Sequence, residues 1–84
     1  MEQIIISGHA RKQMEIRGIS EIDVIAAIEN GDLIFKEKNH RLGLKRYSKL
    51  KMDFDDLTVV WFYNKTDQKE VITVYWRRRG DWYG

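Results

Sequence analysis

The chain has 84 residues, of which 43% are hydrophobic, and a formal net charge of +2, so we expect one folded domain over residues 1–84 with a single core. It contains no cysteine, which excludes disulfides, thiolate metal sites and a cysteine nucleophile. Its longest apolar runs are far shorter than the roughly 20 residues that span a bilayer, and its first residues lack the basic segment of a signal peptide, so we expect a cytoplasmic protein that does not enter the membrane.

The first helix is expected between Ser7 and about Arg17. Ser7 suits the N-cap position, and Ile4–Ile6 before it form a short strand or an extended lead-in. Gly18 ends the helix. When the helix is projected at about 100° per residue, one side collects the apolar residues of a core-facing stripe, which are Ala10, Met14 and Ile16.

A row of polar side chains falls in the same sector of this helix. His9, Gln13 and Arg17 follow one another at a spacing of four residues, so they stack as a ridge beside the core-facing stripe. Either this ridge borders a working cleft, or it is polar structure whose hydrogen bonds are satisfied at the edge of the core.

A second helix is expected after Ser20, whose side chain can cap it, with Asp23 completing an approximate capping box. The helix should end at Asn30-Gly31, where we expect a left-handed stop. Its apolar face is wide and should be more buried than that of the first helix; this face comprises Ile22, Val24, Ile25, Ala26 and Ile28.

From Leu33 onward the apolar residues recur with a period of two, which is typical of strands. Four strands joined by turns are expected, and the third should be central in the sheet because it is apolar on both faces. The order predicts an α+β domain in which two N-terminal helices pack on one face of a four-stranded antiparallel sheet. The expected strands are residues 33–38, 44–51, 57–64 and 70–77.

Positive charge is concentrated in one segment of the chain. Such asymmetry favours a polyanion partner, and we assign RNA binding to Lys45, Arg46, Lys49 and, at the end of the last strand, Arg78. The alternative is a solvated hairpin whose lysines guard an edge strand. Within residues 36–51, Glu37 is the only acid beside seven basic side chains, namely Lys36, Lys38, Arg41, Lys45, Arg46, Lys49 and Lys51.

The chemistry that these residue types favour is metal-free cleavage of RNA. The two histidines lack a spacing typical of metal ligands, and no glycine-rich phosphate loop follows a strand, so we expect no metal and no cofactor. Cleavage of this kind needs a base for the ribose 2′-OH, cations for the pentavalent phosphate and an acid for the leaving 5′-oxygen.

Candidates for these roles lie on the first helix and the last strand. His9 suits the base, because the positive end of the helix dipole disfavours a charged imidazole in the first turn. Arg17 would be a cation in the cleft and Gln13 an orienting neighbour. Tyr75 would supply an acid or a platform for base stacking, and Arg77 a further cation. Structural alternatives are a packed His9, an Arg17 paired with an acid, and a Tyr75 that packs across strands.

The tryptophans have simpler expectations. All three tryptophans, Trp61, Trp76 and Trp82, are expected to be core or interface residues. Trp82 and Tyr83 lie in the tail "GDWYG" and should be exposed unless a partner covers them.

The segment "HARKQMEIRGIS", residues 9–20, and the final "VITVYW", residues 71–76, resemble a family of small bacterial domains of uncharacterised function. That family is similar to the RelE, ParE and BrnT type toxins, so the resemblance implies a RelE-like fold of two helices and an antiparallel sheet. The matching positions are His9, Ala10, Arg11, Met14, Arg17, Gly18, Ile19 and Ser20.

The similarity to these toxins also implies a function. It predicts the toxin component of a bacterial toxin-antitoxin pair, an endoribonuclease that cleaves mRNA, in some relatives on the ribosome. A cognate antitoxin protein would restrain it. The alternative is a non-catalytic module of the same fold that binds nucleic acid or protein.

Overall fold

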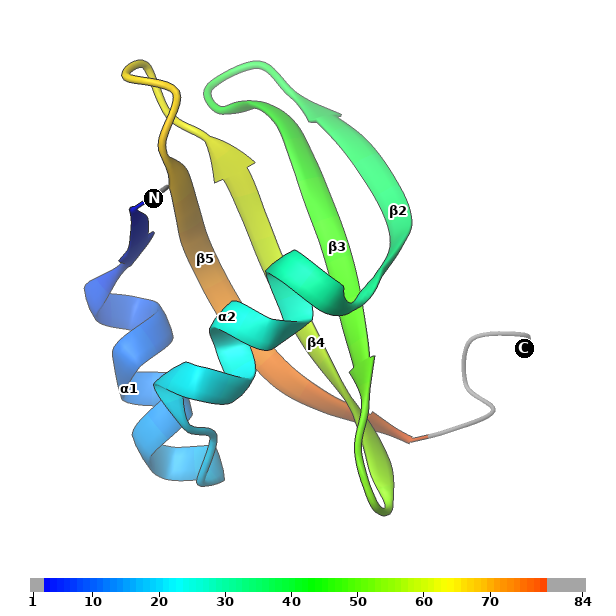
Figure 1. Cartoon of the computed structure of the whole chain (residues 1–84). Coiled ribbons are helices and arrows are strands. Elements are labelled where there is room, and N and C mark those ends of the chain that lie inside the picture. Colours follow the sequence, from blue (N-terminus) through cyan, green and yellow to red (C-terminus); the bar gives the residue numbers. More distant parts are fainter. Residues whose placement is uncertain (1–2, 79–84) are drawn as a thin grey trace.

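The computed structural model describes residues 3–78. Two helices lie on one side of a five-stranded sheet whose strand order is β1-β5-β4-β3-β2 (Figure 1). Along the chain the elements are β1 (Ile4–Ile6), α1 (Gly8–Arg17), α2 (Glu21–Asn30), β2 (Asp32–Asn39), β3 (Gly43–Lys51), β4 (Asp55–Tyr63) and β5 (Lys69–Arg78).

The prediction of a four-stranded antiparallel sheet is wrong, although the α+β class holds. Ile4–Ile6 form a fifth strand, which pairs in parallel with the start of β5, so the sheet is mixed. The backbone N–H of Ser7 continues this pairing by donating to the carbonyl of Val71, at 3.2 Å. The long-range pairing decides the outcome, because three residues carry too little periodicity to distinguish a strand from an extended lead-in.

The remaining strands form the expected meander. β4 is the middle strand and pairs antiparallel with both β3 and β5, which confirms its predicted central place. It begins earlier than expected, because the turn after β3 is short and Asp55 and Asp56 already belong to the strand.

Both helices begin at the predicted caps. The Ser7 hydroxyl accepts a hydrogen bond from the Ala10 N–H, and the Ser20 hydroxyl accepts one from the Asp23 N–H, each at 3.1 Å. Gly18 ends α1 in the left-handed conformation with φ 66°, as glycine readily does.

Gly31 ends α2 for a different reason than the one expected. Its φ of −79° and ψ of −179° are extended, so the predicted left-handed stop is wrong. A Cβ at this position would collide with the carbonyl oxygens of Lys49 and Ala27. Glycine is therefore needed here because helix and strand backbones approach closely.

The core lies between the helices and the sheet. It combines Ala10 and Met14 of α1 and Val24, Ala27 and Ile28 of α2 with core-facing residues of the strands, among them Leu57, Val59, Trp61, Val71 and Val74.

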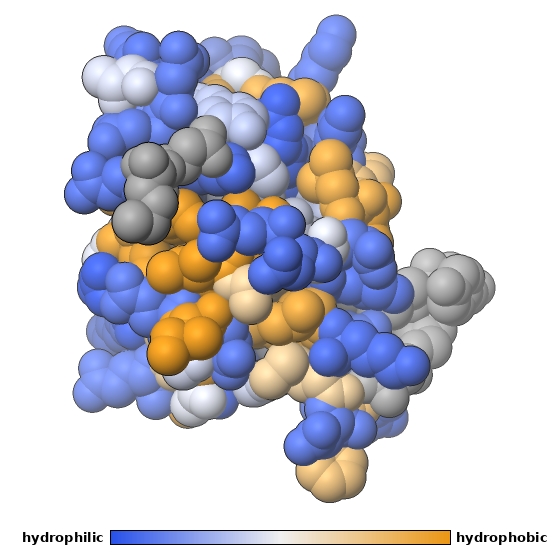
Figure 2. All heavy atoms as spheres, in the orientation of Figure 1, coloured by the Kyte–Doolittle hydropathy of each residue, from blue (hydrophilic) through white to orange (hydrophobic). Residues whose placement is uncertain are grey.

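Two predicted core residues lie outside it. Ile16 is 67% exposed and Ile22 is 79% exposed, because α1 and α2 bury narrower stripes than their apolar residues suggest. Figure 2 shows hydrophobic residues interspersed with hydrophilic ones on the face of the molecule that carries the helices.

Candidate nucleic-acid interface

The face of the sheet that points away from α1 and α2 carries most of the candidate site, and we call it the open face. Side chains alternate between the two faces of a strand. Leu57, Val59 and Trp61 point into the core, so the residues that alternate with them on β4 point to the open face. The same holds for the residues paired with these on β3 and β5, and for the matching positions farther along β3 and on β2. These are Phe35 and Glu37 of β2; Lys45, Tyr47, Lys49 and Lys51 of β3; Asp56, Thr58, Val60 and Phe62 of β4; and Glu70, Thr73, Tyr75 and Arg77 of β5.

Near the β2 edge, the open face carries a cation held between an acid and an aromatic ring. The Lys45 ammonium lies 3.0 Å from the Glu37 carboxylate and 5.8 Å from the centre of the Tyr47 ring. The hydrogen bond to Glu37 raises the pKa of Lys45 above its ordinary value of 10.5; Tyr47 adds to the rise and partial burial opposes it. Lys45 is therefore a stable positive charge. Phe35 contacts Tyr47 edge to face, with ring centres 5.3 Å apart.

Asp56 and Thr58 of the central strand β4 form a buried polar centre on the open face. Asp56 is 1% exposed, and its carboxylate lies 3.9 Å from the Lys49 ammonium. Thr58 is fully buried, and its hydroxyl has no hydrogen-bond partner within residues 3–78. In the sheet, Thr58 lies between Lys49 of β3 and Tyr75 of β5. Long side chains of the neighbouring strands therefore shield this centre, since both helices pack on the other face.

Tyr75 and Arg77 lie beside this centre on β5. Tyr75 pairs with Thr58 and Arg77 pairs with Asp56, so both side chains point to the open face. Four residues selected from the sequence thus share one face of the sheet, namely Lys45, Lys49, Tyr75 and Arg77.

The other two basic candidates point to the opposite side of the sheet. The Arg46 guanidinium lies over the rings of Trp61 and Tyr63, 5.4 and 4.7 Å from their centres. Arg78 is exposed at the end of β5 and alternates with Arg77. The structure therefore does not group Arg46 and Arg78 with Lys45 and Lys49.

The polar ridge of α1 lies at the surface. His9 and Arg17 are exposed, and the Nε of Arg17 donates a hydrogen bond of 2.9 Å to Gln13. The Arg17 carbonyl accepts a 2.9 Å bond from the indole of Trp76, which points to the core side. His9 and Arg17 therefore do not share a face with Tyr75, although the start of α1 lies next to β5.

Comparison with known families adds one result. The family described as "Domain of unknown function (DUF4258)" matches residues 6–76. The chain belongs to this family. No curated protein and no solved structure matches the chain significantly. The family region contains His9, Lys49 and Tyr75, whereas Arg77 and Arg78 lie just beyond it.

Two residues of the DUF4258 region escaped the sequence reasoning. Asp56 and Thr58 were expected in a turn and in an apolar strand, so neither was considered for the site. The signal that reveals them is the alternation of "DLTVV", in which Asp56 and Thr58 point away from Leu57 and Val59. Their polarity on a buried strand marks the centre of the open face.

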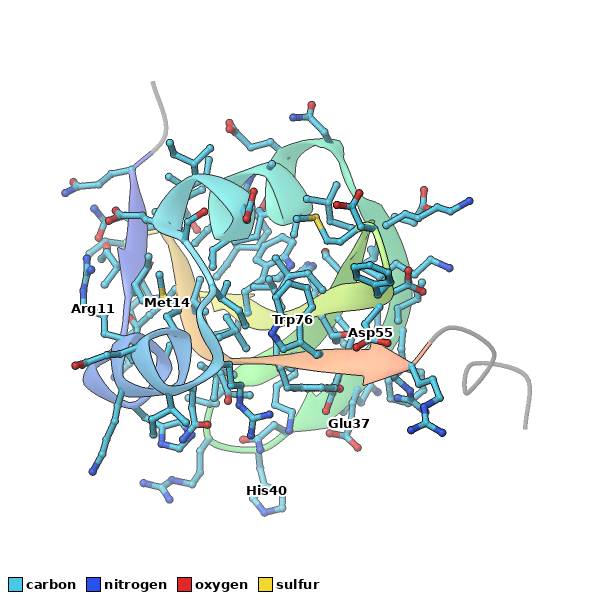
Figure 3. The ribbon with its side chains drawn as sticks, turned by 90° about the horizontal axis from the view of Figure 1, so that it is seen from below. Arg11, Met14, Glu37, His40, Asp55 and Trp76 are labelled. Atoms are coloured by element: carbon cyan, nitrogen blue, oxygen red, sulfur yellow. The ribbon has the colours of Figure 1, made fainter. Side chains whose placement is uncertain are left out.

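Other features bear on which ligands the DUF4258 domain can hold. Residues 3–78 contain no group of three or more His, Cys, Asp or Glu side chains arranged to hold a metal ion. No helix in that part of the chain is long and apolar enough to cross a membrane. His40 projects from the β2–β3 turn at the rim of the molecule (Figure 3). Trp82 and Tyr83 of the tail lie outside the described residues.

Proposed function

We propose that the protein binds single-stranded RNA across the open face and cleaves it without a metal ion, as the toxin of a toxin-antitoxin pair. The observation that supports this is the shared placement of Lys45, Lys49, Tyr75 and Arg77 on one face of the sheet.

The open face has the two elements that single-stranded nucleic acid needs. Ammonium and guanidinium groups attract the phosphate backbone, and exposed rings offer platforms on which bases stack. Phe35 is 54% exposed and is braced by Tyr47, so it is the best-placed platform. Lys45 beside it keeps its charge throughout the neutral pH range.

The proposed cleavage follows from the groups around β5. Arg77 stabilises the pentavalent phosphate while the 2′-oxygen attacks phosphorus and the bond to the 5′-oxygen breaks. Tyr75 gives its phenolic proton to the leaving oxygen, and His9 takes the proton of the 2′-OH. The products are a 2′,3′-cyclic phosphate and a 5′-hydroxyl.

His9 enters this proposal from the edge of the sheet. It follows Ser7 by two residues, and the Ser7 hydroxyl donates a 3.2 Å hydrogen bond to the Ile72 carbonyl of β5. An RNA strand that leaves the open face over this edge passes the first turn of α1. For Arg17 to reach a phosphate its guanidinium must leave Gln13, so we assign it no chemical step.

One observation favours a non-catalytic binding module instead. His9 and Tyr75 come from different layers of the fold, so the proposed base and acid meet only if the RNA spans both. In that case the protein binds RNA with the same residues but leaves it intact.

Incubation of the purified protein with end-labelled RNA in EDTA distinguishes these functions. We expect cyclic-phosphate products, a rate at least about 10²-fold lower in Tyr75→Phe, and unchanged cleavage in the control Lys65→Ala, which alters an exposed turn residue. Binding without cleavage would favour the module, and absence of both would refute the proposal. Expression in bacteria with and without each neighbouring gene then tests the toxin role through growth arrest and its relief.

A further inference from the structure

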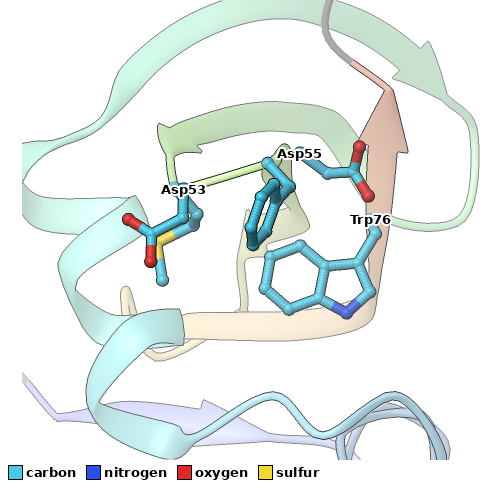
Figure 4. Close-up of a pocket in the computed structure, with 5 residues that line it drawn as sticks. Asp53, Asp55 and Trp76 are labelled. Carbon is cyan, nitrogen blue, oxygen red and sulfur yellow. The ribbon is translucent and has the colours of Figure 1, made fainter.

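A small pocket lies at the β3–β4 turn, on the side of the sheet opposite the open face. It has a volume of about 270 Å³ and is lined by Met52, Asp53, Phe54, Asp55 and Trp76. Figure 4 shows Asp53 and Trp76 on opposite sides of the pocket, with Asp55 beside Trp76. Drug-sized ligands occupy pockets of roughly 300–1,000 Å³, so this one suits a single side chain.

The pocket has two aromatic walls, one exposed and one held in place by a hydrogen bond. Phe54 is 87% exposed at the tip of the turn, so its apolar ring is left in contact with water, which is unfavourable. Trp76 is half-buried, and its indole N–H donates to the Arg17 carbonyl at 2.9 Å, which fixes the orientation of the ring. Met52 packs against the core below. Trp76 and Met52 therefore form the fixed wall of the pocket, and Phe54 stands exposed beside it.

The rim of the pocket is negative. The side-chain carboxylates of Asp53 and Asp55 have no hydrogen-bond or ion-pair partner within residues 3–78. Arg78 pairs with Asp55 in the strand register, yet no ion pair between their side chains is present in that part of the chain. Two carboxylates beside two aromatic rings select a cation with a flat apolar surface.

We propose that this pocket binds the guanidinium of an arginine side chain presented by a protein partner. A guanidinium is planar, is weakly hydrated, stacks on aromatic faces and forms paired hydrogen bonds with carboxylates. An ammonium would satisfy the charge but leave the ring surfaces uncovered. The inference is independent of RNA cleavage, because Trp76 points away from the face that carries Tyr75 and Arg77.

Titration of the ¹⁵N-labelled full chain with the peptide acetyl-Gly-Arg-Gly-amide tests the proposal, with the Trp76 indole N–H signal as the reporter. We expect a saturable shift of this signal. The same peptide with citrulline, which has the shape of arginine without its charge, should cause none, and the lysine peptide should bind more weakly.

Variants locate the binding in the pocket. Phe54→Ala and Asp53→Asn should each weaken binding of the arginine peptide about two- to fivefold or more. Ile22→Ala, which also truncates an exposed apolar side chain but lies on α2 and does not line the pocket, should not. Unchanged amide signals from residues outside the pocket show that each variant is folded. Equal binding of citrulline or lysine, no saturable shift, or insensitivity to both pocket variants would each overturn the proposal.

Discussion

The indole nitrogen of Trp61 donates a hydrogen bond of 2.9 Å to the hydroxyl of Ser48 on the neighbouring strand, and both side chains are buried. Ser48→Ala removes the acceptor and leaves a buried N–H without a partner. We therefore expect the free energy of unfolding to fall by about 1–3 kcal/mol, measured by denaturant unfolding. In a Trp61→Phe background the same change should cost much less. An equal cost in both backgrounds would assign the loss to packing.

The ion pair between Lys45 and Glu37 predicts a dependence on alkaline pH. The folded-state pKa of Lys45 lies above its ordinary value of 10.5, so its contribution to stability is complete below about pH 10.5. That contribution disappears as the pH rises through the folded-state pKa. Lys45→Gln should lower the free energy of unfolding at pH 7 by about 0.2–1 kcal/mol. The gap from the parent protein should close in strongly alkaline buffer, whereas a constant gap would contradict the assignment.

Neighbouring cations on β3 should have different roles because they point to opposite faces. Lys45→Ala should lower RNA affinity and reduce the slope of log affinity against log salt by about 0.7 for a lost phosphate contact. Arg46→Ala should leave the slope unchanged but reduce thermal stability, since Arg46 covers Trp61 and Tyr63. Filter binding across salt concentrations, together with thermal unfolding, measures both. The reverse pattern would place the RNA on the helix side.

The two helix-ending glycines should also respond differently. Gly31→Ala introduces a Cβ into the carbonyl oxygens of Lys49 and Ala27, so α2 must move away from β3. We expect a loss of about 1–3 kcal/mol or more. Gly18→Ala meets no atom within 4 Å and carries only the left-handed backbone cost of about 1–2 kcal/mol. The discriminating signal is a displaced contact between α2 and β3, visible as chemical-shift changes that only the first variant shows.

Local chemistry explains why much of the fold could be predicted from the sequence. Ser7 and Ser20 cap the helices and Gly18 ends α1 through contacts with residues only a few positions away. The alternation along β3 and β4 follows from the period of a strand. The parallel pairing of Ile4–Ile6 with β5 depends on residues about 65 positions away and leaves no local pattern. Gly31 was placed correctly but for the wrong reason, because its constraint comes from another element.

The candidate site was predicted in parts. Residue type alone selected Lys45, Lys49, Tyr75 and Arg77. Alternation groups Lys45 with Lys49 and Tyr75 with Arg77 within their own strands, but the face that both pairs share follows from the pairing of β3 and β5 with β4. The polar ridge of α1 followed equally well from its spacing. The position of this ridge relative to the open face depends on how α1 packs on β5, which the spacing does not reveal. Asp56 was missed because its segment was expected to be a turn, whereas Asp56 belongs to β4.

The ridge of α1 provides the sharpest test of the catalytic proposal. His9→Gln keeps a hydrogen-bonding side chain of similar size but removes an effective base, so RNA cleavage should fall by about 10²-fold or more while thermal stability stays unchanged. Because Arg17 bonds to Gln13 and has no assigned step, Arg17→Lys should reduce cleavage far less. Lys12→Gln, at an exposed position of the same helix, is the matched control. Full cleavage by a folded His9→Gln protein would exclude His9 as the base and leave the strand residues to account for any activity.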